Sequence, residues 1–189
     1  MILACATRAE LRAARRSGSR TALVGLAAAN GVPDGSVISF GLAGSLRDDF
    51  APGTLLDATR VVDTAGTVLW EGEPLGVAGA ERVTILAAET IVDDPTERRR
   101  LHASTGADAA DLESGPLARS GRLSGVLRAV SDTPERTLYG MAEAVTPAGD
   151  YDWAGLARAF AREPRGFARA AADARRALGR LADATRSLG

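Results

Sequence analysis

Asp132 is the residue in this sequence best placed for proton chemistry, because it directly follows an apolar run. The stretch from Val126 to Val130 is apolar except for Arg128, and Ser131 and Asp132 then end it abruptly. A run without polar alternation is typical of a strand buried on both faces. Ligands of open α/β sheets bind beyond the carboxyl ends of the strands, so Ser131 and Asp132 are candidates for chemistry by position.

A helix start is the alternative interpretation of the same residues, and the local pattern alone favours it. Asp132 would be the N-cap, Pro134 would lie early in the helix, and Glu135 would stand three residues on as a capping-box partner. The two interpretations give Asp132 different roles, a general acid or a helix cap.

Glu113 is a second carboxylate at the predicted sheet edge. A strand that ends near Leu112, followed by a helix that opens at Pro116, places Glu113 at the junction between them. This junction would face the same crevice as Asp132.

Glu10 is the third acidic candidate. The stretch from Met1 to Thr7 predicts a first strand, and the stretch from Ala9 to Arg15 predicts the helix after it. Glu10 then falls in the first helical turn, where the helix dipole favours a carboxylate for structural reasons alone. It also lies at the carboxyl end of a strand, where ligands bind.

A glycine-bearing turn is predicted after the buried strand that begins at Val37. Gly41 and Gly44 would let the backbone approach a ligand closely, and the amides between them, such as that of Ala43, could donate to its oxygens. A plain tight turn is the alternative.

Composition narrows the chemistry. The basic residues of the chain are all arginine, which excludes Schiff-base chemistry and a Walker-type phosphate loop, since both need lysine. His102 is the only histidine and Cys5 the only cysteine, so a disulfide within the chain is excluded and no metal site of Cys and His ligands is expected. His102 lies in an arginine-rich segment typical of a solvated helix face. Any catalysis by this chain must therefore rely mainly on carboxylates, hydroxyls, arginines and backbone amides.

The overall composition predicts one globular domain spanning residues 1–189. The hydrophobic share is 46%, the charged share is 25% and the formal net charge is -1. No apolar stretch approaches the roughly 20 residues that a membrane span needs, and Arg8 and Glu10 interrupt the start, so we expect neither a span nor a secretory signal but a cytoplasmic protein. The arginines are dispersed among acids, which argues against a nucleic-acid partner.

The remaining elements supply a scaffold of further strands and helices. Ser17 to Ser19 predicts a turn before a second amphipathic stretch, and two strands are linked by a glycine-rich segment from Gly66 to Gly79. Asp94 fits a helix N-cap. Beyond Asp150 the chain is helical, Pro164 restarts the helix, and an apolar stripe is expected to pack on the sheet. The amphipathic stretch runs from Thr21 to Asn30, and the two strands run from Thr54 to Val62 and from Arg82 to Leu86. The members of the stripe are Phe167, Ala171, Ala174, Leu178 and Leu181.

Three of these stretches together resemble the purine nucleoside phosphorylase and nucleosidase superfamily. They are Ile38 to Leu46 (ISFGLAGSL), Asp111 to Ser114 (DLES) and Arg128 to Asp132 (RAVSD), in that order and each at a predicted strand end. The continuation Ser131 to Arg136 (SDTPER) and the preceding Thr105 to Ala107 (TGA) are most similar to the hopanoid-associated phosphorylase branch. The likeness runs from about residue 35 to the end and, more faintly, over the first dozen residues.

The resemblance implies a three-layer α/β/α sandwich around a mixed, partly closed sheet, in shortened form. It also implies cleavage of the N-glycosidic bond of a purine (adenosine-type) nucleoside by phosphorolysis or hydrolysis, including that of an adenosylated hopanoid precursor. The implied partner is a small-molecule purine nucleoside, and the implied assembly is a homo-oligomer such as a dimer. No cofactor is expected, with inorganic phosphate as a co-substrate if the reaction is phosphorolysis.

Residue roles follow from the resemblance position by position. Asp132 matches the general acid at N7 of the departing base, and Glu10 matches the glutamate that activates water in the nucleosidases. Glu113 matches the carboxylate on the ribose hydroxyls, with Leu112 beside the sugar, and Val92 falls near the base-binding backbone. A proton donor for the base and a carboxylate near an oxocarbenium-like sugar are what this chemistry needs. Ser131, Ala43 and Gly44 complete the predicted substrate site.

Two departures from the family pattern bear on activity. Leu42 stands where many members have a serine that contacts phosphate or sugar, so the acceptor, water or phosphate, stays open. Arg128 and the loop from Ser17 to Ser19 are the candidate phosphate donors. The chain also lacks a pair of strands after its first helix, and such a loss could leave a sheet edge exposed. The alternatives are a strict 5′-methylthioadenosine/S-adenosylhomocysteine-type nucleosidase and a catalytically silent nucleotide-binding member.

Overall fold

A closed ring of five strands forms the centre of the protein in a computed structural model that describes residues 1–141 and 144–187. Within the ring β3 pairs with β8, β8 with β4, β4 with β6, β6 with β7, and β7 returns to β3. Both parallel and antiparallel pairings occur, so the sheet is mixed, and the ring makes it partly closed, as predicted. The bounds are β3 (Val37–Ser45), β4 (Leu55–Val62), β6 (Ala80–Ala87), β7 (Ala109–Asp111) and β8 (Leu123–Asp132).

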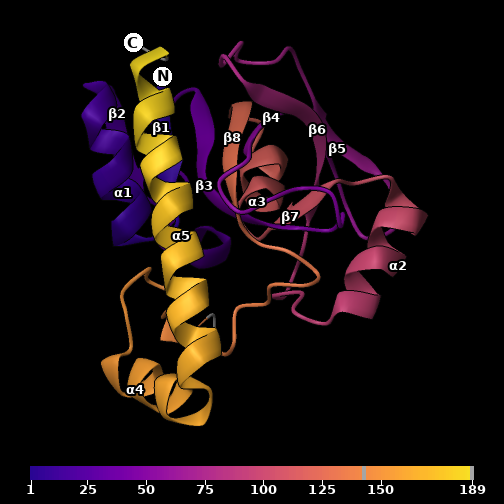
Figure 1. Cartoon of the computed structure of the whole chain (residues 1–189). Coiled ribbons are helices and arrows are strands. Elements are labelled where there is room, and N and C mark those ends of the chain that lie inside the picture. Colours follow the sequence, from indigo (N-terminus) through magenta and orange to yellow (C-terminus); the bar gives the residue numbers. More distant parts are fainter. Residues whose placement is uncertain (142–143, 188–189) are drawn as a thin grey trace.

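Three further strands extend this ring into an open sheet (Figure 1). β1 (Ile2–Cys5) runs parallel to β3, β2 (Arg20–Leu23) runs parallel to β1, and β5 (Val68–Glu71) runs antiparallel to β4. β5 lies inside the glycine-rich segment from Gly66 to Gly79, which was predicted only as a link. β2 begins the predicted amphipathic stretch, and the stretch continues into a 3₁₀ helix, η2 (Leu26–Ala28).

The described part of the chain forms five α-helices. They are α1 (Arg8–Ala14), α2 (Pro95–Thr105), α3 (Ser114–Arg119), α4 (Trp153–Arg162) and α5 (Pro164–Ala184), with short 3₁₀ helices η1 (Arg15–Ser17) and η4 (Thr185–Ser187). Thr7 caps α1 and Asp94 caps α2 through side-chain oxygens that accept backbone N–H bonds. Pro164 opens α5 as the sequence indicated. Figure 1 shows α5 running alongside α1 and the ring.

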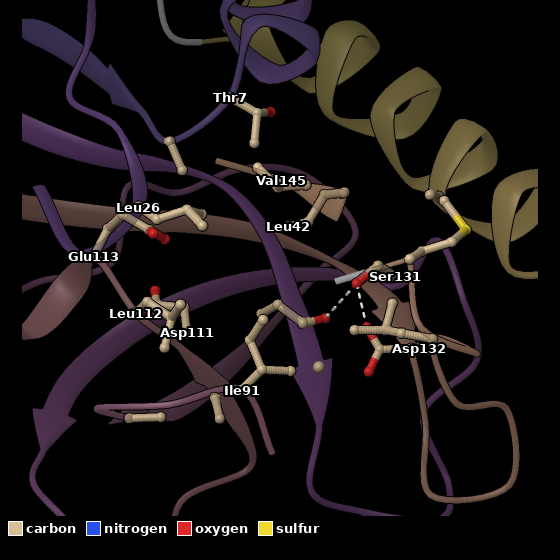
Figure 2. A pocket seen from close by; sticks show the side chains of 18 of the residues that line it. Thr7, Leu26, Leu42, Ile91, Asp111, Leu112, Glu113, Ser131, Asp132 and Val145 are labelled. Atoms are coloured by element: carbon tan, nitrogen blue, oxygen red, sulfur yellow. Dashed lines mark hydrogen bonds between the residues drawn. The ribbon is translucent and has the colours of Figure 1, made fainter. Parts of the chain in front are cut away.

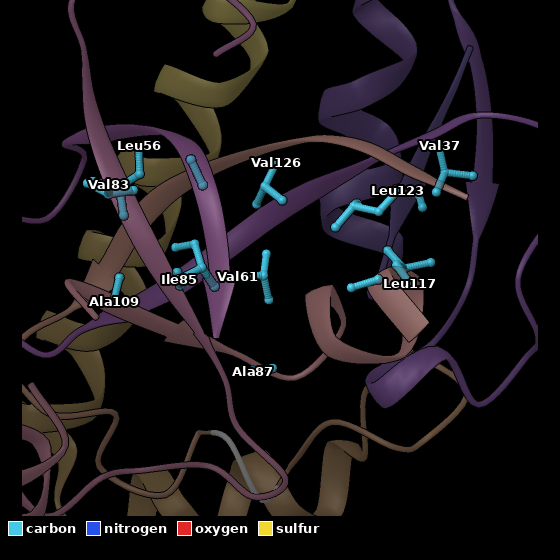
Figure 3. Close-up of a cluster of buried hydrophobic side chains, with 14 of the residues drawn as sticks. Val37, Leu56, Val61, Val83, Ile85, Ala87, Ala109, Leu117, Leu123 and Val126 are labelled. Carbon is cyan, nitrogen blue, oxygen red and sulfur yellow. The ribbon is translucent and has the colours of Figure 1, made fainter. Parts of the chain in front are cut away.

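The strands bury side chains on both faces, because successive residues point to opposite sides. In β1, Ile2 belongs to a buried cluster that includes Leu117 of α3, whereas Leu3 belongs to a cluster that includes Leu181 of α5 (Figure 3 shows the first cluster). Helices therefore pack on both faces of the sheet, which gives the predicted three-layer α/β/α arrangement.

The buried stripe of α5 lies beside the predicted one. Ala170 and Ala177 are buried, and Leu181, the last member of the predicted stripe, is buried with them. Ala174 and Leu178 are only half-buried and line a pocket, and Leu178 also packs against the buried cluster that includes Leu3 and Leu181. Among the residues that the structure describes, no helix is both long and apolar enough to cross a bilayer.

Candidate active site

One pocket of about 220 Å³ is lined by the predicted catalytic and substrate-binding residues. Its walls are the carboxyl ends of β3, β7 and β8 and the segments that follow β1 and β6 (Figure 2). The predicted residues that line it are Glu10, Ala43, Gly44, Val92, Leu112, Glu113, Ser131 and Asp132. Glu113, Asp132 and Gly44 line this pocket together, whereas Gly41, the other glycine of the predicted turn, is not among its described lining residues.

Asp132 ends strand β8, and no helix begins after it. Thr133 and Arg136 instead pair across a tight turn, so the helix-cap interpretation of Asp132 is wrong. The Asp132 carboxylate accepts hydrogen bonds from the Ser131 hydroxyl on Oδ1 and from Arg98 on Oδ2. Burial raises the pKa of Asp132 above its ordinary value, against the opposing effect of the Arg98 charge. These conditions favour a carboxyl group that can hold a proton.

Arg98 is a charged residue of this site that was not predicted from the sequence. It projects from α2, its side chain is only 1% exposed, and it forms a buried ion pair with Asp132. The sequence held one signal for it, since Leu101, one turn later, is also buried and marks the inward face of α2. In the sequence this face is hard to recognise, because Arg98 lies within a run of charged residues from Glu97 to Arg100.

Gly41 and Gly44 lie within β3, not in a turn after it, which corrects that prediction. Both positions have close side-chain neighbours: a Cβ on Gly41 would lie 2.6 Å from Arg128 Nη1, and one on Gly44 would lie 2.8 Å from Asp132 Oδ2. The glycines thus make room for the charged groups of the site itself, which a larger residue would displace.

Glu113 follows β7 and is held in a buried acid cluster. Its Oε1 accepts a hydrogen bond from the backbone N–H of Ala27 at 3.2 Å, and its Oε2 lies 3.6 Å from Arg128 Nη2. The Arg128 guanidinium also pairs with Asp111 at 2.6 Å. Burial raises the pKa of Glu113 to about 8, although the Arg128 charge acts in the opposite direction.

Glu10 serves both as a helix cap and as part of the pocket. In the capping box of α1, Glu10 Oε2 accepts from the backbone N–H and the hydroxyl of Thr7, at 2.8 and 3.0 Å. Its Oε1 accepts from the backbone N–H of Leu42 at 2.8 Å. These bonds hold the carboxylate at the pocket wall with a fixed orientation.

Neither candidate phosphate donor lies in this pocket. Arg128 is fully buried behind the wall, where it pairs with Asp111, and its Nε and Nη1 have no hydrogen-bond partner in the described part of the chain. The turn from Ser17 to Ser19 does not line the pocket either. Of the described residues, Arg98 is the only arginine in the lining, and it is engaged with Asp132.

The C-terminal part of the chain adds an apolar wall to the pocket. This wall consists of side chains that follow β8 or project from α4 and α5, namely Leu138, Met141, Val145, Tyr151, Leu156, Ala174 and Leu178. The carboxylates and the apolar wall thus face the same pocket, a combination typical of a small-molecule site.

Comparison with known proteins identifies solved structures that have a similar fold. No protein-family model and no curated protein matches the chain. Among solved structures, the futalosine hydrolase of Helicobacter pylori superposes with a TM-score of 0.67 at 15% identity, over 99% of this chain and 95% of that one.

Two nucleosidase structures show the same likeness. The 5′-methylthioadenosine/S-adenosylhomocysteine nucleosidase of S. pneumoniae gives a TM-score of 0.64 at 13% identity, over 100% of this chain and 99% of that one. The Helicobacter pylori nucleosidase of the same name gives 0.59 at 17% identity, over 96% and 97%. The chain therefore has the fold seen in these nucleosidase structures.

Proposed function

We propose that this protein hydrolyses the N-glycosidic bond of an adenosine-type purine nucleoside. One observation carries the proposal: Glu10, Glu113 and Asp132 come from three separate elements and line a single pocket. This pocket occurs in a fold shared with proteins named as nucleosidases and as a futalosine hydrolase.

In the proposed reaction Asp132 gives its proton to N7 of the purine as the bond from C1′ to N9 breaks. The bonding electron pair leaves with the base, and positive charge develops on the sugar, where the Glu10 carboxylate stabilises it. Glu113 binds the ribose hydroxyls. Glu10 takes a proton from the water that attacks C1′, and exchange with solvent returns Asp132 and Glu10 to their starting states.

Water is favoured over phosphate as the acceptor. A phosphate dianion needs cationic or amide donors that are free to bind it. Arg98 is the one arginine in the described lining, and its charge is balanced by Asp132. The hydroxyl that the family pattern offers is replaced by Leu42, whose backbone N–H is already bonded to Glu10.

The apolar wall supports a substrate with an apolar group on the 5′ carbon of the sugar. A methylthio group, or the hydrocarbon of an adenosylated hopanoid precursor, would bury apolar area there, at about 25 cal/mol per Å². A charged amino-acid group would find no ion partner among the apolar side chains of this wall.

Release of free adenine, followed by chromatography, tests the proposal. The purified protein is incubated with adenosine, 5′-methylthioadenosine, S-adenosylhomocysteine and a 5′-alkyl-5′-deoxyadenosine with a long chain, each with and without phosphate. We expect adenine and a free reducing sugar, independent of phosphate, with the apolar 5′ substituents preferred.

Two results would overturn parts of this proposal. A ribose 1-phosphate that carries the 5′ substituent of the substrate, formed only when phosphate is present, would replace hydrolysis by phosphorolysis. No adenine from any substrate, together with saturable binding of the same nucleosides, would leave the protein as a catalytically silent nucleoside-binding member of this fold.

A further inference from the structure

Arg98 connects three parts of the pocket that are distant in sequence. Its Nε donates to the carbonyl of Val92 at 2.8 Å, and its Nη1 donates to the carbonyl of Ser45 at 3.2 Å. Its Nη2 pairs with Asp132 and lies 3.7 Å from Asp93. One guanidinium thus holds the segment after β6, the end of β3 and the end of β8 in fixed positions.

We propose that Arg98 is a positioning residue for departure of the base: it holds Asp132 against the Val92 wall and stabilises the carboxylate that forms when Asp132 gives up its proton. This inference rests on the proposed nucleosidase reaction. Arg98 acts through Asp132, and the planar guanidinium is suited to this because its five donors have a rigid arrangement.

Stability alone does not account for this ion pair. A buried ion pair is often neutral or unfavourable compared with apolar residues of similar size, because both charges lose their hydration. Here Arg98 is 1% exposed and Asp132 is 3% exposed, so the desolvation of both is nearly complete. An apolar pair would have filled the same space, which points to a chemical reason for these two charges.

The charge of Arg98 supplies that chemical reason. The charged groups facing Asp132 are Arg98 from α2 and Asp93 from the segment before α2, and Ser131 on β8 adds a hydroxyl donor. Proton transfer to the base turns Asp132 into an anion in a buried site, where an adjacent cation has a large effect. In the resting protein the same cation lowers the pKa of Asp132 against the effect of burial.

Four single variants, one double variant and the wild type test the inference through adenine release measured from pH 5 to pH 10. Arg98→Gln removes the charge and keeps an amide that can hydrogen-bond, whereas Arg98→Lys keeps the charge on a single nitrogen. Arg99→Gln is the matched control, because Arg99 is the next residue of α2, is half exposed and pairs with Asp48 outside the pocket. Asp132→Asn shows which part of the fall in rate at high pH, the alkaline limb of the profile, is due to ionisation of Asp132.

We expect Arg98→Gln to lower kcat by about 10- to 100-fold, the effect of one charge-assisted hydrogen bond to a developing anion. Its alkaline limb should move up by about 1–3 pH units, because the carboxyl group loses the adjacent cation. Arg98→Lys should keep the limb near its wild-type position but lower kcat, since one ammonium nitrogen cannot reach the three acceptors of the guanidinium. Arg99→Gln should match the wild type. A double variant of Arg98→Gln with Asp132→Asn should be no slower than Asp132→Asn alone.

The outcomes separate this inference from the proposed function. A folded Arg98→Gln protein with wild-type kcat and an unmoved alkaline limb would overturn the role of Arg98 while leaving the nucleosidase reaction intact. If Arg98→Gln does not fold, Arg98→Lys decides, and wild-type kcat in that variant would overturn the inference. A wild-type protein that releases no adenine would overturn both.

Discussion

Gly44 lies opposite Asp132 in the parallel pairing of β3 with β8, and a Cβ at position 44 would stand 2.8 Å from Asp132 Oδ2. The same Cβ would lie 3.3 Å from Arg98 Nη2. A methyl group there must push the carboxylate or the guanidinium out of place.

Gly44→Ala should therefore reduce adenine release by up to about 10²-fold, because small displacements of catalytic groups have effects of this size. Unfolding in denaturant should show a loss of about 1–3 kcal/mol from overpacking. Gly179→Ala on α5 is the control. Its Cβ would meet nothing within 4 Å, so it should raise the free energy of unfolding by about 0.5–1 kcal/mol and leave activity unchanged. Equal activity in the two variants would contradict the crowding argument.

Asp132→Asn should lose about 10²–10⁴ in rate, because the amide carries no transferable proton at neutral pH. The same change removes the close counterion of the buried Arg98 and leaves only Asp93 at 3.7 Å, at a cost of up to about 3–5 kcal/mol in the free energy of unfolding. Adding Arg98→Gln should restore stability but not activity. If the single and double variants had the same free energy of unfolding, the ion pair would make no contribution to the stability of the fold.

Glu10→Gln should slow adenine release by about 10²–10⁴, since the amide cannot take a proton from water. The matched control is Glu97→Gln, because Glu97 is also in the first turn of a helix but is exposed and pairs with Arg100. Glu97→Gln should retain full activity. Steady-state kinetics with 5′-methylthioadenosine makes the comparison, and equal rates for both variants would leave Glu10 with only its capping role.

Glu113 should make the protein less stable as the pH rises. Burial raises its pKa from 4.5 to about 8, so the folded chain holds a proton that the unfolded chain releases. Stability from this group is full below about pH 4.5, declines as the pH rises toward 8, and is then constant. Thermal unfolding of the wild type and Glu113→Gln across this range should show the variant gaining Tm relative to the wild type. A Tm difference that does not change with pH would show that Glu113 is ionised throughout.

The sequence predicted the carboxylates of the site because each follows a recognisable element. Asp132 ends a run that is apolar except for Arg128, and Glu10 falls in the first turn of the helix after the first strand, so local pattern determines their positions. Arg98 could not be found in this way, because α2 is polar and its inward face carries a charge in place of an apolar side chain. The short edge strand β5 was missed for a related reason, since its half-buried residues give weak alternation.

The roles of Gly41 and Gly44 depended on contacts that no local pattern contains. The groups that crowd Gly41 come from α1 and β8, and those that crowd Gly44 come from α2 and β8. A glycine in a motif suggests a turn or a ligand, whereas here the close neighbours are side chains of the protein itself. Only the assembled sheet distinguishes these cases.

The closed ring of strands has a consequence for how activity appears during folding. Gly44 and Asp132 are 88 residues apart in the sequence and pair only when β8 enters between β3 and β4. Contacts over such separations form slowly, because a long loop must close before they contribute free energy. Asp132 and its partner Arg98 can come together only in that step. A refolding chain should therefore regain secondary structure before it regains adenine release, and the rate at which activity returns should report closure of the ring.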